Sequence, residues 1–177
     1  MEIRTLQESD KALYSELWRN ALVEQDEFFR ISIEDEPSPQ IQTKFSIDSF
    51  TLGAFINTNL LGTVSVERDV RAKLEHKALL FRMFVHPSAA GKGVGKALVN
   101  EAISQARSIQ GLRQLYLTVL DVNERAIHLY TSAGFETFAH EPESVKIKKK
   151  FIGELQMVYF VTTPDQSFKR DWLKPAP

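Results

Sequence analysis

The stretch PSAAGKGVGKALVNEAI, Pro87–Ile103, decides the fold because it joins two different hydrophobic patterns. Before it, residues 76–87 (HKALLFRMFVHP) are almost continuously apolar, which is typical of a strand covered on both faces. From residue 93 to residue 109, apolar side chains recur at helical spacing, and polar side chains lie on the opposite side. The stretch therefore predicts a strand, a glycine-rich loop and a helix in succession.

The loop reads G-K-G-V-G-K at residues 91–96. The first N–H groups of a helix have no intrahelical partner, and the helix dipole places partial positive charge beside them. Glycine lacks a Cβ, so a phosphate can approach the main chain closely, and the two lysines add charge. The alternative is a flexible surface turn with solvated lysines. We expect a pyrophosphate site formed by Gly91, Lys92, Gly93, Val94, Gly95 and Lys96.

Two common phosphate-binding motifs do not fit this loop. A P-loop is excluded because Ala90 stands where its first glycine belongs, and Ala97 stands where its magnesium-binding hydroxyl belongs. A dinucleotide fingerprint that begins at Gly91 meets Lys96 where its last glycine belongs. The ligand must therefore come from another class of phosphate compound.

Composition narrows the function further. The 177 residues fit one domain, and 22 basic against 23 acidic residues provide no overall field that would attract nucleic acid or a membrane. The absence of cysteine removes disulfides, thiolate nucleophiles and Cys-ligated zinc. The beginning of the chain does not resemble a signal peptide, and no apolar run is long enough for a membrane span. We expect a cytoplasmic protein that binds neither nucleic acid nor membrane.

Periodicity predicts the remaining elements. A helix after an N-cap at Ser9 would bury Leu13, Leu17, Ala21 and Leu22, and a short helix is expected over residues 39–47. A second long helix is expected at 123–134. The predicted strands are 2–6, 51–56, 60–69, 76–87, 111–120, 135–140 and 151–161, the last two forming a hairpin across 141–150. The expected domain is 1–162, followed by a loose tail at 163–177.

Two motifs together resemble one known family. Residues 83–99, MFVHPSAAGKGVGKALV, resemble the acyl-CoA pyrophosphate loop of the GNAT N-acetyltransferases, with Ala90 where the family usually has Arg or Gln. Residues 123–135, NERAIHLYTSAGF, resemble the second segment of that family, and residues 146–157 more loosely resemble its closing strand. The resemblance implies an α/β fold with a mixed, mostly antiparallel central sheet flanked by helices, the acyl-CoA N-acyltransferase fold.

The resemblance also implies a site for acetyl-CoA as co-substrate, with no metal. Main-chain groups of Met83, Phe84 and Val85 would bind the pantetheine arm, and an N–H near Met83 would polarise the thioester carbonyl. In the second motif, Asn123 would cap the helix and touch the cofactor, Ala126 would border it, and Tyr130 would protonate the leaving sulfur. A packed Tyr130 with no chemical role is the alternative.

The base and the acceptor are less closely defined. Glu67 and Glu154 are the candidate general bases, His86 is better explained as a strand-end residue, and a water chain could serve instead. Residues 23–37 carry six acidic residues and two phenylalanines, which would suit a cationic amine or simply be solvated. The lysine cluster at 146–150 would be a solvated hairpin tip or contact the adenosine phosphate.

The resulting prediction is an acetyl-CoA-dependent N-acetyltransferase acting on a primary amine of a small molecule or peptide, with a homodimer possible through sheet edges. The alternative is a non-catalytic acyl-CoA-binding sensor or interaction module with the same fold.

Overall fold

The computed structural model describes residues 1–162, and the fold is built on one seven-stranded sheet. The strand order is β1-β2-β3-β4-β5-β7-β6, and every neighbouring pair is antiparallel except β4 and β5, which are parallel. The predicted mixed, mostly antiparallel sheet is therefore confirmed. The strands are β1 Glu2–Thr5, β2 Ser49–Ile56, β3 Asn59–Arg68, β4 Lys77–Val85, β5 Gln114–Leu120, β6 Glu136–Ile147 and β7 Lys150–Phe160.

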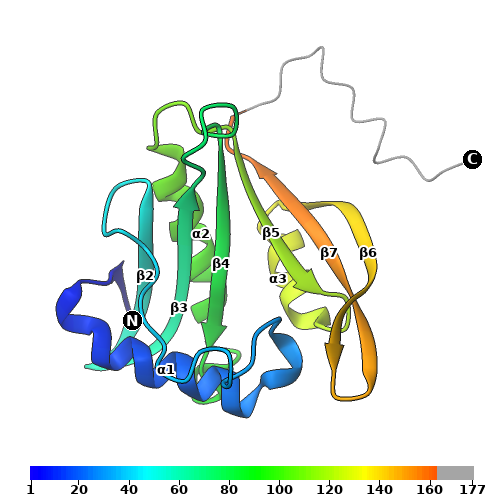
Figure 1. Cartoon of the computed structure of the whole chain (residues 1–177). Helices are drawn as coiled ribbons and strands as arrows, with labels where there is room; N and C mark the ends of the chain where they lie inside the picture. The colour runs from blue at the N-terminus through cyan, green and yellow to red at the C-terminus, as the bar shows by residue number, and fades with distance from the viewer. Residues whose placement is uncertain (163–177) are drawn as a thin grey trace, which may run out of the picture.

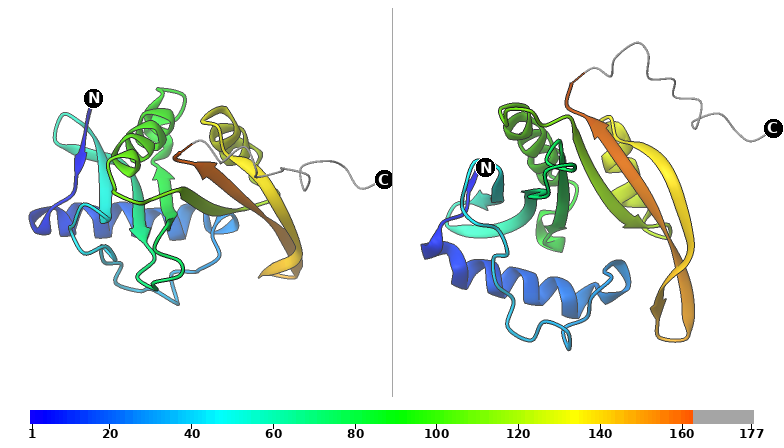
Figure 2. Two further views of the ribbon diagram at one scale, coloured as in Figure 1. Left: turned by 90° about the horizontal axis from the view of Figure 1, so that it is seen from above. Right: turned by 45° about the horizontal axis from the view of Figure 1, so that its top comes forward.

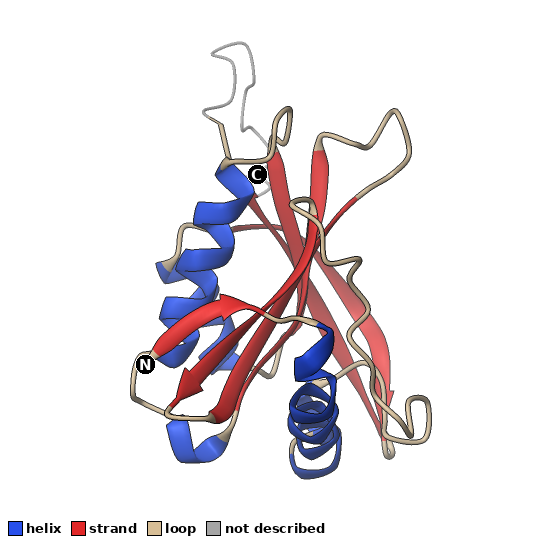
Figure 3. Ribbon diagram, turned by 90° about the vertical axis from the view of Figure 1, so that its left-hand side faces the viewer, coloured by secondary structure: helices blue, strands red, loops and turns tan. Residues whose placement is uncertain are grey.

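Helices cover both faces of the sheet. The helix α1 (Lys11–Glu24) lies across one face, whereas α2 (Val94–Arg107) and α3 (Glu124–Ser132) lie on the other (Figures 1 and 3). The view from above in Figure 2 shows the same separation of α1 from α2 and α3. Three short 3-10 turns complete the elements: η1 Glu8–Asp10, η2 Asp26–Phe28 and η3 Pro87–Ala89. Within residues 1–162, no helix is both long and apolar enough to cross a membrane.

Two hydrophobic clusters hold these layers together. The larger one lies between the sheet and α2, whose inward stripe includes Val94, Leu98 and Ala102. The second lies under α1, where Trp18 and Phe84 are both buried. Because both faces of the central strands are covered, β2 is buried at nearly every position, as expected for a sheet enclosed by two layers.

The start of α1 differs from the prediction. A 3-10 turn precedes the helix, so Ser9 is not its N-cap, and Asp10 accepts a hydrogen bond from the Gln7 N–H at 2.8 Å. Leu13 is 38% exposed, and Tyr14 and Trp18 enter the core instead. Leu17, Ala21 and Leu22 are buried as predicted, and the two large aromatic side chains fill the remaining space under the helix.

No helix forms over residues 39–47, contrary to the sequence prediction. The segment, which precedes β2 in the chain, lies alongside that strand instead. The Thr43 and Thr51 hydroxyls lie 2.9 Å apart, and the Lys44 N–H donates a hydrogen bond to Ser49 Oγ at 2.9 Å. Phe45 adopts a φ of 55°, which a helix would not allow. Tertiary contacts with the neighbouring strand therefore outweigh the local signal from the prolines.

The final hairpin is longer than predicted. Its turn is formed at Lys148, with a φ of 57°, so most of the expected loop at 141–150 belongs to β6. Val145 pairs with Ile152 beyond a bulge that absorbs the irregular residues after Glu141. A bulge lets a strand continue past residues that cannot keep the regular ladder, which explains why Pro142 does not end it. The predicted tail at 163–177 lies outside the described residues.

Candidate functional site

A cleft of about 1130 Å³ crosses the sheet where β4 and β5 separate. Their parallel pairing ends at Leu79 and Tyr116, although β4 continues to Val85 and β5 continues to Leu120. Figure 1 shows the two strands diverging from that point. The backbone edge of β4 beyond Leu79 is therefore open to the cleft and available for hydrogen bonds to a ligand.

A bulge at Arg82 shapes this open edge. Arg82 has a φ of 51°, and the pairing of β3 with β4 shifts register at this point. On one side of the strand, Met83 and Val85 pack against the main core beside Gly95. On the other side, Phe84 enters the cluster under α1. The bulge thus fixes the direction in which each side chain points while leaving the main chain of residues 83–85 facing the cleft.

The glycine loop has the conformation that an anion site requires. Gly91 and Gly93 have φ values of 73° and 77°, and a Cβ at either position would meet no atom within 4 Å. The first intrahelical bond of α2 runs from the Ala97 N–H to the Gly93 carbonyl at 3.0 Å. The N–H groups of Val94 and Gly95 therefore have no partner within the helix. Open space and free donors coincide at the tip of α2.

The helix α3 brings the second motif to the same cleft. The Asn123 side chain accepts a hydrogen bond from the Ala126 N–H at 3.1 Å, which confirms its predicted capping role. Tyr130 is 6% exposed and packs edge-to-face on Phe135. Burial raises the pKa of the Tyr130 phenol, because the charged phenolate would lose its hydration. The phenol therefore keeps its proton over the whole physiological range.

Most of the residues predicted for the site line this one cleft. Lys92 does not line it, and its main-chain N–H instead bonds the Ala89 carbonyl at 3.4 Å. The lysines at the hairpin tip do not line it either, and Lys146 stacks on the Phe151 ring. The predicted residues that line the cleft are Glu67, Met83, Phe84, Val85, Gly91, Gly93, Val94, Gly95, Lys96, Asn123, Ala126, Tyr130 and Glu154.

The two candidate bases lie at different levels of the cleft. Glu67 on β3 pairs with Leu79 on β4, and Leu79 pairs with Tyr116 on β5. Glu67 therefore lies at the level where β4 and β5 still pair. Glu154 is opposite Leu120, four residues farther along β5. At about 3.3 Å per residue, the two levels are separated by about 13 Å along the strands. Met83 also lies beyond the last β4–β5 pair, on the part of β4 that follows the bulge at Arg82.

His86 has the structural role expected of it. Its Nδ1 accepts a hydrogen bond from the Ser88 N–H at 3.2 Å, which caps the turn η3. Across residues 1–162, no group of three or more His, Cys, Asp or Glu side chains is arranged to hold a metal ion.

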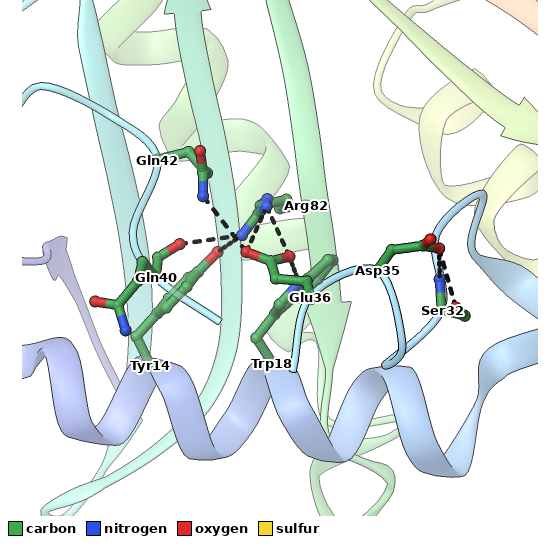
Figure 4. A network of polar contacts seen from close by, with 8 residues as sticks. All are labelled: Tyr14, Trp18, Ser32, Asp35, Glu36, Gln40, Gln42 and Arg82. Atoms are coloured by element: carbon green, nitrogen blue, oxygen red, sulfur yellow. Dashed lines mark hydrogen bonds and ion pairs between the residues drawn. The ribbon is translucent and has the colours of Figure 1, made fainter. Parts of the chain in front are cut away.

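A polar network around Arg82, which the sequence did not predict, lies at the wall of the cleft and is shown from close by in Figure 4. Arg82 Nη2 donates to both carboxylate oxygens of Glu36, at 2.9 and 2.8 Å, and Nη1 donates to the Tyr14 hydroxyl at 3.1 Å. Its guanidinium also lies over the Trp18 ring. The network joins three segments, α1, the loop that contains Glu36 and β4, and the sequence pattern contains no signal that connects them.

The acidic loop presents aromatic rather than acidic side chains to the cleft. Its lining residues are Gln25, Phe28, Phe29, Arg30 and Ile31. Glu36 is neutralised by Arg82, and Asp35 accepts hydrogen bonds from the Ser32 N–H and hydroxyl at 2.8 and 2.9 Å. Within the described chain, the only carboxylates that line the cleft are therefore Glu67 and Glu154.

The sequence matches known proteins over most of the region that forms the cleft. The family model described as the acetyltransferase (GNAT) family matches residues 11–135. A spermidine N(1)-acetyltransferase from Vibrio cholerae is 30% identical over 93 residues, which make up 52% of this chain and 52% of that protein. The chain spans about half the length, or less, of the first curated relatives it matches.

Solved structures resemble this one over nearly the whole chain. An acetyltransferase of the GNAT family from Streptococcus pneumoniae has a TM-score of 0.80 at 26% identity, covering 91% of this chain and 99% of that one. The protein yncA from Salmonella typhimurium, solved with its cofactor acetyl-CoA, has a TM-score of 0.76 at 20% identity. That likeness covers 94% of this chain and 98% of that one, and shows a shared fold.

Proposed function

The chain belongs to the GNAT acetyltransferase family, and on this premise we propose that it transfers an acetyl group from acetyl-CoA to a primary amine. The amine attacks the thioester directly, without an acyl-enzyme intermediate. The chain has no cysteine, and neither Ser88, which contacts the His86 ring, nor Ser144, which contacts Glu154, lines the cleft, so a covalent route has no support.

The cleft fits the chemistry of the co-substrate. A pyrophosphate requires close main-chain donors and no obstructing side chain, and the tip of α2 offers both at Gly93 and Gly95. The pantetheine arm carries amide groups, which the open edge of β4 from Met83 to Val85 can bind as a missing strand would. Ala90 removes a side chain from the loop but no main-chain donor.

The transfer requires a polarised carbonyl and a proton for the departing thiolate. We assign the first role to the main-chain N–H at Met83, on the open edge beside the bulge. We assign the second role to the Tyr130 phenol, which burial keeps protonated. The C–N bond forms as the C–S bond breaks. The amine loses its proton to a base, and the sulfur gains one from the phenol.

We infer that Glu154, rather than Glu67, takes the proton of the amine. Glu154 lies at the level of Leu120, beyond the last β4–β5 pair, and Met83 lies beyond that pair on β4. Glu67 lies about 13 Å from that level along the strands, a distance that its side chain alone does not span.

The observation that carries the proposal is the meeting of the glycine loop, the open β4 edge and Tyr130 in one cleft. The test is titration calorimetry with CoA, followed by measurement of free thiol when acetyl-CoA is mixed with a panel of amines. The panel includes spermidine, because the Vibrio cholerae relative is named for that substrate. Binding of CoA and acceptor-dependent thiol release are expected. Binding of CoA without turnover of any amine would favour the non-catalytic module. Absence of CoA binding would exclude both the acetyltransferase and the acyl-CoA-binding module.

A further inference from the structure

We propose that Arg30 occupies, with its own guanidinium, the subsite in which Glu154 receives the positively charged end of the acceptor. The acceptor is then a primary amine attached to an apolar arm, and it displaces Arg30 on binding. This inference rests on the proposed acetyl transfer, and it names the chemical class of the acceptor and an internal competitor for it.

Glu154 is a buried carboxylate with one oxygen left without a hydrogen bond. The residue is 1% exposed, and its Oε2 accepts a hydrogen bond from the Ser144 hydroxyl at 2.6 Å. Its Oε1 is buried and, within residues 1–162, has no hydrogen-bond donor. A buried acceptor without a donor is costly, because the water that it lost on folding has not been replaced. This oxygen is therefore suited to a donor that arrives with a ligand.

Arg30 provides a charge near this oxygen but not a hydrogen bond. Its Nε lies 3.3 Å from Glu154 Oε1, whereas its side chain is 58% exposed. Among the described residues, the Arg30 guanidinium has no other ion-pair or hydrogen-bond partner. An exposed, singly held ion pair contributes little to stability. A ligand can therefore displace the Arg30 side chain at a small cost in free energy, because Arg30 lies in the loop that follows η2 and its side chain is exposed.

An ammonium group is the donor that this oxygen lacks. Its compact charge carries three N–H donors, so a primary ammonium can point one hydrogen at Oε1 where the Arg30 Nε does not. Once bound there, the same carboxylate can accept the proton that the amine must lose before attack. Binding and deprotonation then use one side chain.

The neighbouring wall defines the rest of the acceptor. Phe28, Phe29 and Ile31 flank Arg30 in the loop and line the cleft. Phe29 is held edge-to-face against Trp18, with ring centroids 5.1 Å apart, so this apolar wall is anchored to α1. The acids of the loop do not line the cleft, and Glu67, the other carboxylate that does, lies about 13 Å from Glu154 along the strands, so no second carboxylate belongs to this wall. An alkyl or arylalkyl monoamine fits this wall better than a polycation.

The subsite should also accept a free guanidinium, because it already holds one. Butylguanidine is the probe, and hexylamine is the acceptor in a thiol-release assay at saturating acetyl-CoA. We expect butylguanidine to compete with hexylamine and not with acetyl-CoA. We expect Arg30→Ala to lower the KM for hexylamine about two- to fivefold, the range that loss of a weak exposed ion pair allows. Arg113→Ala, at an exposed arginine outside the cleft, is the matched control.

Glu154→Gln should raise the KM for hexylamine at least about tenfold and abolish inhibition by butylguanidine. Glu141→Gln, at the exposed glutamate paired with Glu154 in the ladder, should change neither. Inhibition that does not compete with the amine, or a higher KM in Arg30→Ala, would overturn the inference. If no amine is turned over, calorimetry of butylguanidine with the wild type and Glu154→Gln still decides it, because equal binding to both excludes the subsite. Failure of CoA binding would instead count against the proposed function alone.

Discussion

Arg82 Nη2 donates hydrogen bonds to both carboxylate oxygens of Glu36, so a loop residue and the bulge residue of β4 are tied together beneath the cleft. The two side chains are 13% and 16% exposed. Because Arg82 directly precedes Met83, the contact shown in Figure 4 joins the loop that contains Glu36 to the open edge of β4. Loop and strand are thus held in one arrangement.

Glu36→Gln should therefore destabilise the protein. The substitution leaves the positive charge of Arg82 largely buried without its counter-charge, and we expect a loss of about 2 kcal/mol in the free energy of unfolding. Urea denaturation followed by circular dichroism measures it. Glu27→Gln, at an exposed acid of the same loop, is the control and should change stability by less than about 0.5 kcal/mol. Equal effects of the two variants would show that the contact with Arg82 contributes nothing.

Gly93→Ala should weaken both stability and CoA binding. An alanine at a φ of 77° costs about 1–2 kcal/mol, although no atom obstructs its Cβ. Gly111 has a φ of 78° in the turn before β5 and does not line the cleft, so Gly111→Ala imposes the same backbone cost elsewhere. Calorimetry with CoA should show reduced affinity for Gly93→Ala only. Similar CoA affinity in the two variants would remove the glycine loop from the site.

Tyr130→Phe should slow acetyl transfer by about a hundredfold while leaving CoA binding almost unchanged, because only the proton donor is lost. Burial raises the pKa of the phenol above its usual value of about 10. The wild-type turnover rate should therefore not fall between about pH 8 and pH 10, where an unperturbed phenol would begin to ionise. A decline over that range that disappears in Tyr130→Phe would show that the phenol ionises normally.

Glu67→Gln separates the two candidate bases. We expect a loss of less than about threefold in turnover, because Glu67 lies at the level of Leu79, where β4 and β5 still pair. Glu154→Gln should lose at least about a hundredfold in turnover under the same conditions. The measurement is the rate of thiol release at saturating acetyl-CoA. If the order of the two effects is reversed, the assignment of the base passes to Glu67.

Asp10 should make stability depend on acidity. Its carboxylate is 8% exposed and accepts hydrogen bonds from Arg4 at 2.7 and 2.8 Å. These hydrogen bonds are the largest cause of the lowered pKa of Asp10. A lowered folded-state pKa contributes stability above the unfolded value of about 4, and this contribution is lost as the pH falls through the folded value. Urea midpoints should therefore fall more steeply below about pH 4 for the wild type than for Asp10→Asn. Parallel curves would refute the linkage.

The sequence predicted the site best where chemistry depends on the main chain. Gly93 needs a positive φ and Asn123 needs to cap a helix, and both requirements are local, so short motifs reveal them. The strands with strong alternation or continuous apolar runs were also predicted, because burial on a sheet leaves a regular pattern. The family resemblance then supplied the arrangement of these elements as a mixed, mostly antiparallel sheet flanked by helices.

The sequence failed where contacts join distant segments. The segment at 39–47 is held by the hydroxyl of Thr51, and Arg82 meets partners from α1 and from the loop. The pairing of Glu154 with Arg30 spans most of the chain and follows no spacing rule. Such contacts depend on the finished packing, so neither propensity nor periodicity contains them.

Within residues 1–162, only three residue pairs, from Lys77–Gln114 to Leu79–Tyr116, join the half of the sheet that begins at β1 to the half that ends at β6. The two halves are thus paired at one end of β4 and β5 and separated at the other. A co-substrate bound between the diverging ends of β4 and β5 would add main-chain hydrogen bonds between the two halves where the strands do not pair. Holding the substrate and stiffening the scaffold would then be a single event.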